Sequence, residues 1–242
     1  MPITIMPTIT RMITEPVSCG DYLVLQAWFS PAFPIGSFSF SHGLEWAVEA
    51  ADVTDRASAE AWIGDLLCHG SGMNDAILLA HAYRAEAAQD GDRLRVVAEL
   101  AAAFQPGRER LLESHVQGRA FLDAVMTAWP PPRPLVLTCV WDGPLAYAVT
   151  VAASAAAHHL ALAPTLEAYL SAFVANLVSA AIRLSALGQS DGQRIIAALL
   201  PHVRDTAARA RAASLDELGG SCLRADLASL RHETQYTRLF RS

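Results

Sequence analysis

The stretch LAYAVTVAASAAAHHLALAPTLEAYLSAFVANLVSAAIRLSAL, residues 145–187, is the most apolar part of the chain and decides its fold class. A membrane-spanning helix needs about 20 predominantly apolar residues in a row. Pro164, Glu167 and the pair His158 and His159 interrupt the stretch, and alanine dominates it rather than leucine or isoleucine. We therefore predict buried helices of a soluble α-protein, with no membrane as a partner.

Helical signals continue on both sides of this stretch, in apolar residues at helical spacing and in residues that cap or stop helices. The only strand-like pattern is at Leu135–Val140. The sequence predicts an all-α fold, a single-domain bundle of about ten helices over residues 19–242 that follows a flexible N-terminal extension over residues 1–18. The expected helices are 21–30, 43–51, one from a cap at Asp55 or Ser58 to about 69, 74–88, 92–104, 106–126, 144–160, 164–187, 193–213 and 223–233.

The composition favours a protein that works in a complex. The chain is 52% hydrophobic and only 17% charged, whereas soluble domains are typically about 25% charged. The net charge is −6 without a basic block, which gives no electrostatic basis for nucleic-acid binding. The chain contains no lysine, so the lysine of a phosphate-binding loop and a Schiff-base lysine are both excluded.

The cysteines and the N-terminus indicate where the protein works. Four cysteines, Cys19, Cys68, Cys139 and Cys222, form no CxxC pair, so no zinc or dithiol redox site is expected. The first residues lack a basic segment followed by a continuous apolar one, so we expect no secretory signal. The expected location is the cytoplasm, and no cofactor or metal site is predicted.

The segment SPAFPIGSFSFSHGLEWAVE (residues 30–49) could form an active-site loop or a contact surface. A nucleophile elbow needs G-x-S-x-G after a strand, and here a phenylalanine stands at the second glycine position with no strand before it. Ser39 and Ser41 can instead accept hydrogen bonds from the N–H groups that open the next helix. Phe33, Phe38 and Phe40 are expected to pack internally or to face a partner. Hydrolase chemistry, with Ser41 as nucleophile or a metal held by His232, stays as the alternative.

The C-terminal tail SLRHETQYTRLFRS (residues 229–242) combines arginines with apolar and aromatic residues. HETQY lacks the second histidine of the H-E-x-x-H zinc motif. Tyr236, Leu239 and Phe240 follow i, i+3, i+4 spacing, which predicts one apolar stripe with an arginine rim. Aromatic residues and arginine are enriched in interface hot spots, so we predict that the tail is a docking element.

Three segments in this order resemble the UreF family of urease accessory proteins: SPAFPIGSFSFSHGLE (30–45), GQSDGQ (188–193) and RHETQYTRLFRS (231–242). VQGRAF (116–121) is also similar to a family segment. The resemblance covers the chain from about Leu23 onward. It implies an all-α homodimer without enzymatic activity that assembles with the scaffold protein UreD, also called UreH, and the GTPase UreG. That complex delivers nickel to apo-urease, and the UreF-like subunit is expected to regulate GTP hydrolysis.

The same resemblance implies two sets of partner-binding residues, the tail seating against UreD and the earlier segment facing the dimer mate or the GTPase. Physical reasoning from the sequence gives Glu45 no role of its own. The expected residues are Pro34, Gly36, Phe38, Ser41, Gly43 and Glu45 in the earlier segment, and Arg231, His232, Glu233, Tyr236, Arg238, Leu239 and Phe240 in the tail.

Overall fold

The computed structural model describes residues 19–220 and 222–242, and every regular element in them is helical. The all-α prediction is thus confirmed, while the extension predicted at residues 1–18 lies outside the described residues. The elements are α1 (Cys19–Trp28), η1 (Ser37–Ser39), α2 (Leu44–Glu49), α3 (Arg56–His69), α4 (Ser71–Ala87), α5 (Gly91–Ala103), α6 (Arg108–Ala128), α7 (Val136–Val140), α8 (Tyr147–Ala157), α9 (Leu162–Arg183), α10 (Gln189–Ala212), η2 (Leu215–Glu217) and α11 (Leu223–His232).

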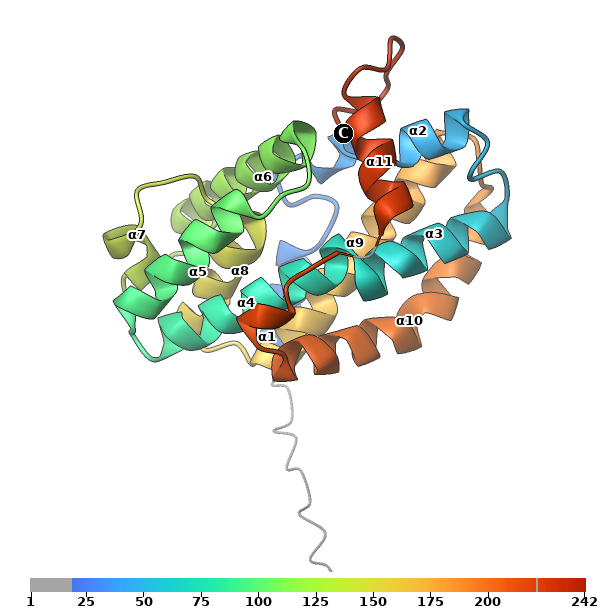
Figure 1. Ribbon diagram of the computed structural model, residues 1–242. Helices are drawn as coiled ribbons and strands as arrows, with labels where there is room; N and C mark the ends of the chain where they lie inside the picture. The colour runs from blue at the N-terminus through green and yellow to red at the C-terminus, as the bar shows by residue number, and fades with distance from the viewer. Residues whose placement is uncertain (1–18, 221) are drawn as a thin grey trace, which may run out of the picture.

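The helices gather in two groups that α4 joins (Figure 1). α5, α6, α7 and α8 lie at one end of the molecule, and α2, α3 and α10 lie at the other. α4 packs against α5 and α8 in the first group and against α3 and α10 in the second. α11 lies against α2, and the chain ends beside it. This arrangement brings the C-terminal tail next to the segment around residues 37–49.

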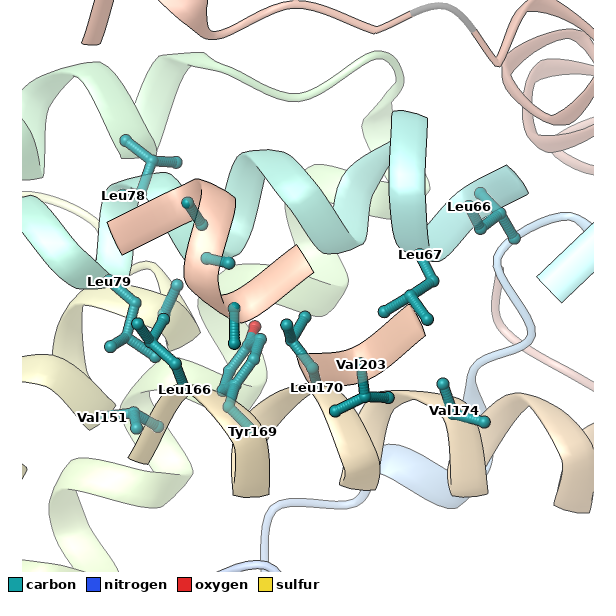
Figure 2. Close-up of a cluster of buried hydrophobic side chains, with 14 of the residues drawn as sticks. Leu66, Leu67, Leu78, Leu79, Val151, Leu166, Tyr169, Leu170, Val174 and Val203 are labelled. Atoms are coloured by element: carbon teal, nitrogen blue, oxygen red, sulfur yellow. The ribbon is translucent and has the colours of Figure 1, made fainter. Parts of the chain in front are cut away.

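Apolar side chains from α3, α4, α8, α9 and α10 meet in the core (Figure 2). Leu67, Leu79 and Leu170 are completely buried there, and Tyr169 nearly so. Among the described residues, only α9 is long and apolar enough to cross a membrane, and half of its most apolar window is buried inside this protein. Its packing against α10 and α4 is that of a core helix.

Local capping explains several helix starts. Asp55 begins α3 as predicted: its side chain accepts the N–H of Ser58 at 2.8 Å, and the Ser58 hydroxyl accepts the N–H of Asp55 at 3.1 Å. This reciprocal pair satisfies donors that a helix start otherwise leaves free. Asp90 caps α5 in the same way by accepting the N–H of Arg93 at 3.0 Å.

The strand-like pattern at Leu135–Val140 does not form a strand, because Val136–Val140 forms the short helix α7. Glu86 explains the difference. Its two carboxylate oxygens accept the N–H groups of Val136 and Leu137 at 2.9 and 3.0 Å, and Arg133 pairs with the same carboxylate at 2.6 Å. A buried carboxylate from α4 therefore caps a helix start that the local sequence does not announce.

Other helix starts also differ from the prediction, among them those of α4, α6, α8 and α10. α6 begins at Arg108 rather than at Pro106, and α10 begins at Gln189, so most of GQSDGQ is helical rather than a turn. The α10 start is fixed by packing: a side-chain carbon on Gly192 would lie 2.7 Å from the Ile182 side chain. Glycine lets the first turn of α10 approach α9 closely.

Candidate functional site

The side chain of Glu45 in α2 binds backbone N–H groups of the C-terminal tail. One carboxylate oxygen accepts the N–H of Leu239 at 2.6 Å, and the other accepts the N–H of Phe240 at 2.9 Å. The carboxylate is nearly buried. Hydrogen bonds to an ionised acceptor are about twice as strong as neutral ones. Glu45 is thus the residue that fixes where the tail runs.

His232, at the end of α11, lies between two carboxylates. Its Nδ1 is 2.6 Å from Glu109 and its Nε2 is 3.0 Å from Glu45, and the side chain is completely buried. The ring is therefore held between the two carboxylates by both of its nitrogens. Arg238 pairs with Glu109 at 2.6 Å. The tail therefore supplies polar partners for two carboxylates that the fold buries.

The last residues of the chain lie along Ser39 to Ser41. The N–H and the hydroxyl of Ser41 both donate to the Ser242 carbonyl oxygen, at 2.7 and 2.5 Å. The Ser41 hydroxyl also accepts the N–H of Glu45 at 3.3 Å, as predicted for a helix-opening serine. The same prediction for Ser39 is replaced by a backbone contact, in which its carbonyl oxygen accepts the N–H of Arg241 at 2.7 Å.

Glu113 of α6 is the third buried carboxylate. It accepts hydrogen bonds from His42 at 2.9 Å, Gln117 at 3.0 Å and the Ser242 hydroxyl at 3.1 Å, and it pairs with Arg110. Burial alone would raise the pKa of Glu113, but Arg110 and His42 outweigh burial and hold the pKa at about 2. This ionised carboxylate stabilises the fold above its ordinary pKa, and that contribution is lost as the pH falls towards 2.

His42 contacts this pair inside the protein. Burial lowers the pKa of His42, and the charge of Arg110 lowers it further. Glu45, Glu109 and Glu113 bind side chains and N–H groups of the tail. We use the name carboxylate network for these three residues together with the groups bound to them. It joins α2, α6, α11 and the tail into one unit.

Glu233 explains why α6 begins at Arg108. Its carboxylate accepts the N–H of Arg108 at 2.7 Å and that of Glu109 at 3.3 Å. Gly107, at the cap position, has no side chain with which to do this. A tail residue therefore caps a helix that begins 125 residues earlier in the chain, and no local pattern announces it.

Gly43 lets α2 approach α11 closely. Its φ is +75°, and a side-chain carbon there would lie 2.6 Å from the backbone nitrogen of Ser229. Gly36 also has a positive φ, +71°, but the space around it is open. Gly43 therefore meets both a conformational and a steric requirement, whereas Gly36 meets only the first.

The prediction that Tyr236, Leu239 and Phe240 form one apolar stripe on a helix is wrong. α11 ends at His232, and the N–H groups of Leu239 and Phe240 bind Glu45 rather than helix carbonyls. Tyr236 is fully exposed and Leu239 is 64% exposed, whereas Phe240 is 4% exposed. Phe240 turns into the protein, where the Arg183 guanidinium lies 4.3 Å from its ring centre.

The structure divides the residues predicted to bind partners into three sets. Pro34, Phe38, Arg231, Tyr236, Arg238 and Leu239 are exposed, Gly36 and Glu233 are partly exposed, and Ser41, Gly43, Glu45, His232 and Phe240 are buried. The sequence reading missed three exposed leucines on α11: Leu223, Leu227 and Leu230. Their i, i+4, i+7 spacing is the signal that would have revealed a second apolar face on that helix.

Ser41 and His232 are not arranged as the active site of a hydrolase. The Ser41 hydroxyl is buried and engaged with the Ser242 carbonyl and the Glu45 N–H, and His232 is engaged by carboxylates on both sides. Within residues 19–220 and 222–242, no group of three or more His, Cys, Asp and Glu side chains is placed to hold a metal ion.

The fold and the network define an all-α protein in which buried charges hold chain segments together and apolar side chains of α11 and the tail are left at the surface. Comparison with known proteins names the family. The sequence model of UreF matches residues 53–200. The urease accessory protein UreF of Rhodopseudomonas palustris (strain BisB5) is 56% identical over 221 residues, which are 90% of each chain. That of Bradyrhizobium diazoefficiens is 51% identical over 236 residues, covering 94% of this chain and 98% of the relative.

The chain belongs to the UreF family of urease accessory proteins. Its role is therefore in urease maturation, as an accessory protein rather than an enzyme. The hydrolase alternative agrees with neither the family nor the geometry around Ser41 and His232.

Proposed function

We propose that this protein is a scaffold that joins UreD (UreH), the GTPase UreG and apo-urease, so that nickel is delivered to the urease active site. In this proposal nickel is cargo, GTP hydrolysis takes place in UreG, and this subunit regulates it. The proposal includes a homodimer and a cytoplasmic location. It rests on membership of the UreF family and on the surface described next.

The observation that carries the proposal is the exposed apolar surface of α11 and the tail. Tyr236 and Leu239 face outward although the residues around them are fixed by the carboxylate network. On the preceding helix, Leu223, Leu227 and Leu230 are 68%, 46% and 45% exposed. Apolar side chains on a rigid support, with arginines beside them, are typical of protein interfaces. We assign this surface, the α11–tail surface, to UreD.

The structure also decides how this assignment is tested. Deleting residues 232–242 would remove the partners of Glu45, Glu109 and Glu113 together and would confuse folding with binding. Exposed positions avoid this problem. Tyr236→Ala combined with Leu239→Ala is expected to weaken UreD binding at least about tenfold, since interface hot spots contribute about 2 kcal/mol or more.

Val96→Ala is the matched control, because Val96 is 57% exposed on α5, away from this surface. Binding of purified UreD is measured by calorimetry or by immobilised-protein assays, with circular dichroism to confirm folding. Unchanged affinity in the folded double variant would show that UreD does not bind the α11–tail surface.

Phe38 supports a second contact, with the dimer mate or UreG. It is 66% exposed on η1, while the neighbouring Phe40 is buried and holds the segment in place. Phe38→Ala is expected to weaken UreG recruitment or dimerisation and to leave UreD binding intact. Light scattering of the protein alone and with each partner separates these outcomes, and no change in either assembly would overturn the assignment of this segment.

A further inference from the structure

A cavity of about 410 Å³ lies beside the carboxylate network, between residues 28–38 and helices α4, α6, α8 and α9. Aromatic rings form part of its walls. The rings of Tyr147 and Tyr169 are 5.3 Å apart, and Phe29 lies edge-on to Tyr169 at 6.1 Å. The aromatic residues that line it are Trp28, Phe29, Phe33, Phe38, Tyr147, Tyr169 and Phe173. A cavity of this size accommodates a small molecule or one long side chain.

Asp75 of α4 is the polar group in this aromatic setting. One carboxylate oxygen accepts the Tyr169 hydroxyl at 2.8 Å, and no described Arg or His side chain lies within ion-pair distance of it. Burial raises the pKa of Asp75 to about 6. A carboxylate without a paired cation in a buried site is costly, so a cation that reached it would be strongly stabilised.

The Tyr147 hydroxyl is a second group available to a ligand. Among the described residues it has no hydrogen-bond partner, although Tyr147 lines the cavity. Asp75 and Tyr147 line the same cavity, and Tyr169, whose ring lies 5.3 Å from that of Tyr147, binds Asp75. Burial and then the charge of Asp75 raise the pKa of Tyr147. A donor placed between them would satisfy both.

The remaining charged groups that line the cavity balance one another. Arg110 pairs with Glu113, and Glu113 also binds His42, whose pKa is lowered. The Arg110–Glu113 pair contributes no net charge, although the charge of Arg110 acts against burial at Asp75 and lowers its pKa. Ionised Asp75 therefore leaves one negative charge in a cavity walled by aromatic rings, the combination that recognises organic cations.

We propose that this cavity binds a primary ammonium group. The ammonium donates to the free oxygen of Asp75 and to the Tyr147 hydroxyl, and the aromatic rings contact the rest of the cation. The group comes from a small free amine or from a lysine side chain of a partner protein. This chain contains no lysine, so a second copy cannot supply that side chain.

The test measures binding of n-butylammonium chloride to the purified protein by calorimetry, with potassium chloride at equal concentration as the control. A second arm uses an acetylated and amidated Gly-Lys-Gly peptide. We expect saturable binding of at least one ammonium probe, weakened at least tenfold in Asp75→Asn, which keeps the size of the side chain. Binding is also expected to weaken as the pH falls below 6, because Asp75 then takes up a proton.

Tyr147→Phe keeps the proposal testable if Asp75→Asn does not fold, and it is expected to weaken binding about threefold to tenfold. Saturation by the amine identifies a free ligand, and saturation by the peptide alone identifies a partner lysine. Three results would overturn the proposal: no saturable binding of either probe, equal binding of potassium, or unchanged binding in a folded variant. None of these results bears on the α11–tail surface, so the two proposals fail separately.

Discussion

Replacing Glu45 with alanine is expected to release the C-terminal tail and to lower the free energy of unfolding. Glu45 accepts the N–H groups of Leu239 and Phe240 and holds one nitrogen of His232. A hydrogen bond to a charged group contributes about 1.5–3 kcal/mol. The sum for three bonds is an upper limit, because a released tail can bind water. Removing one partner of a buried ion pair costs about 3–5 kcal/mol, and we expect a loss in that range.

Urea unfolding gives the free energy, and hydrogen exchange of the Leu239 and Phe240 amides reports the tail directly. Glu60→Ala is the control, because Glu60 makes an exposed ion pair with Arg56 at 3.0 Å, which contributes less than about 1 kcal/mol. Glu45→Gln keeps one acceptor oxygen and should lie between alanine and the native residue. If Glu45→Ala stays within about 1 kcal/mol of the native protein and both amides keep their protection, the role given to Glu45 is refuted.

Three other substitutions test the same structure. In Gly43→Ala the new side-chain carbon would clash with the Ser229 backbone and the alanine would have to adopt a positive φ, so we expect a loss of more than about 2 kcal/mol in thermal or urea unfolding. Gly36→Ala is the comparison, because the space around Gly36 is open and only the positive φ is unfavourable, so we expect a loss of about 1 kcal/mol. Glu233→Ala should cost about 1 kcal/mol and speed hydrogen exchange at the first amides of α6, and unchanged exchange there would contradict the cap. The pKa of Asp75 is raised to about 6, so its stabilising contribution is complete below its ordinary pKa and is lost as the pH rises through 6. Relative to the native protein, Asp75→Asn should therefore gain stability on the order of 2 kcal/mol between pH 4.5 and pH 7.5, and parallel pH profiles would contradict this.

The sequence was sufficient for the fold class because helical spacing and alanine-rich stretches are local properties. The sequence was less reliable as a guide to the residues at which helices begin. Glu86 caps α7 from 50 residues away, and Glu233 caps α6 from 125 residues away. In both cases the helix starts where a distant carboxylate accepts its first N–H groups, and a window of neighbouring residues does not contain that carboxylate. Asp55, one of the two caps predicted for α3, lies next to the helix that it caps, so a local pattern was enough to find it.

The tail shows the same limit more severely. Its i, i+3, i+4 spacing predicted a helical stripe, but a helix requires the N–H groups of Leu239 and Phe240 to bind carbonyls four residues earlier. Glu45 takes both of these N–H groups, and His232 and Arg238 anchor the flanking residues to Glu109. The partners of Glu45 lie 187 to 195 residues away, so no local pattern could give it a role.

The carboxylate network also changes how substitutions in the two segments are interpreted. The segment around Glu45 and the tail, which lie far apart in the sequence, form one unit in the structure. A substitution at Glu45 displaces Leu239 without touching a partner, whereas a substitution at Tyr236 removes only an exposed side chain. Loss of partner binding at Glu45 should therefore be accompanied by loss of stability, and loss at Tyr236 should not. A Glu45 variant that keeps native stability and tail protection but no longer binds a partner would place the carboxylate itself in the interface.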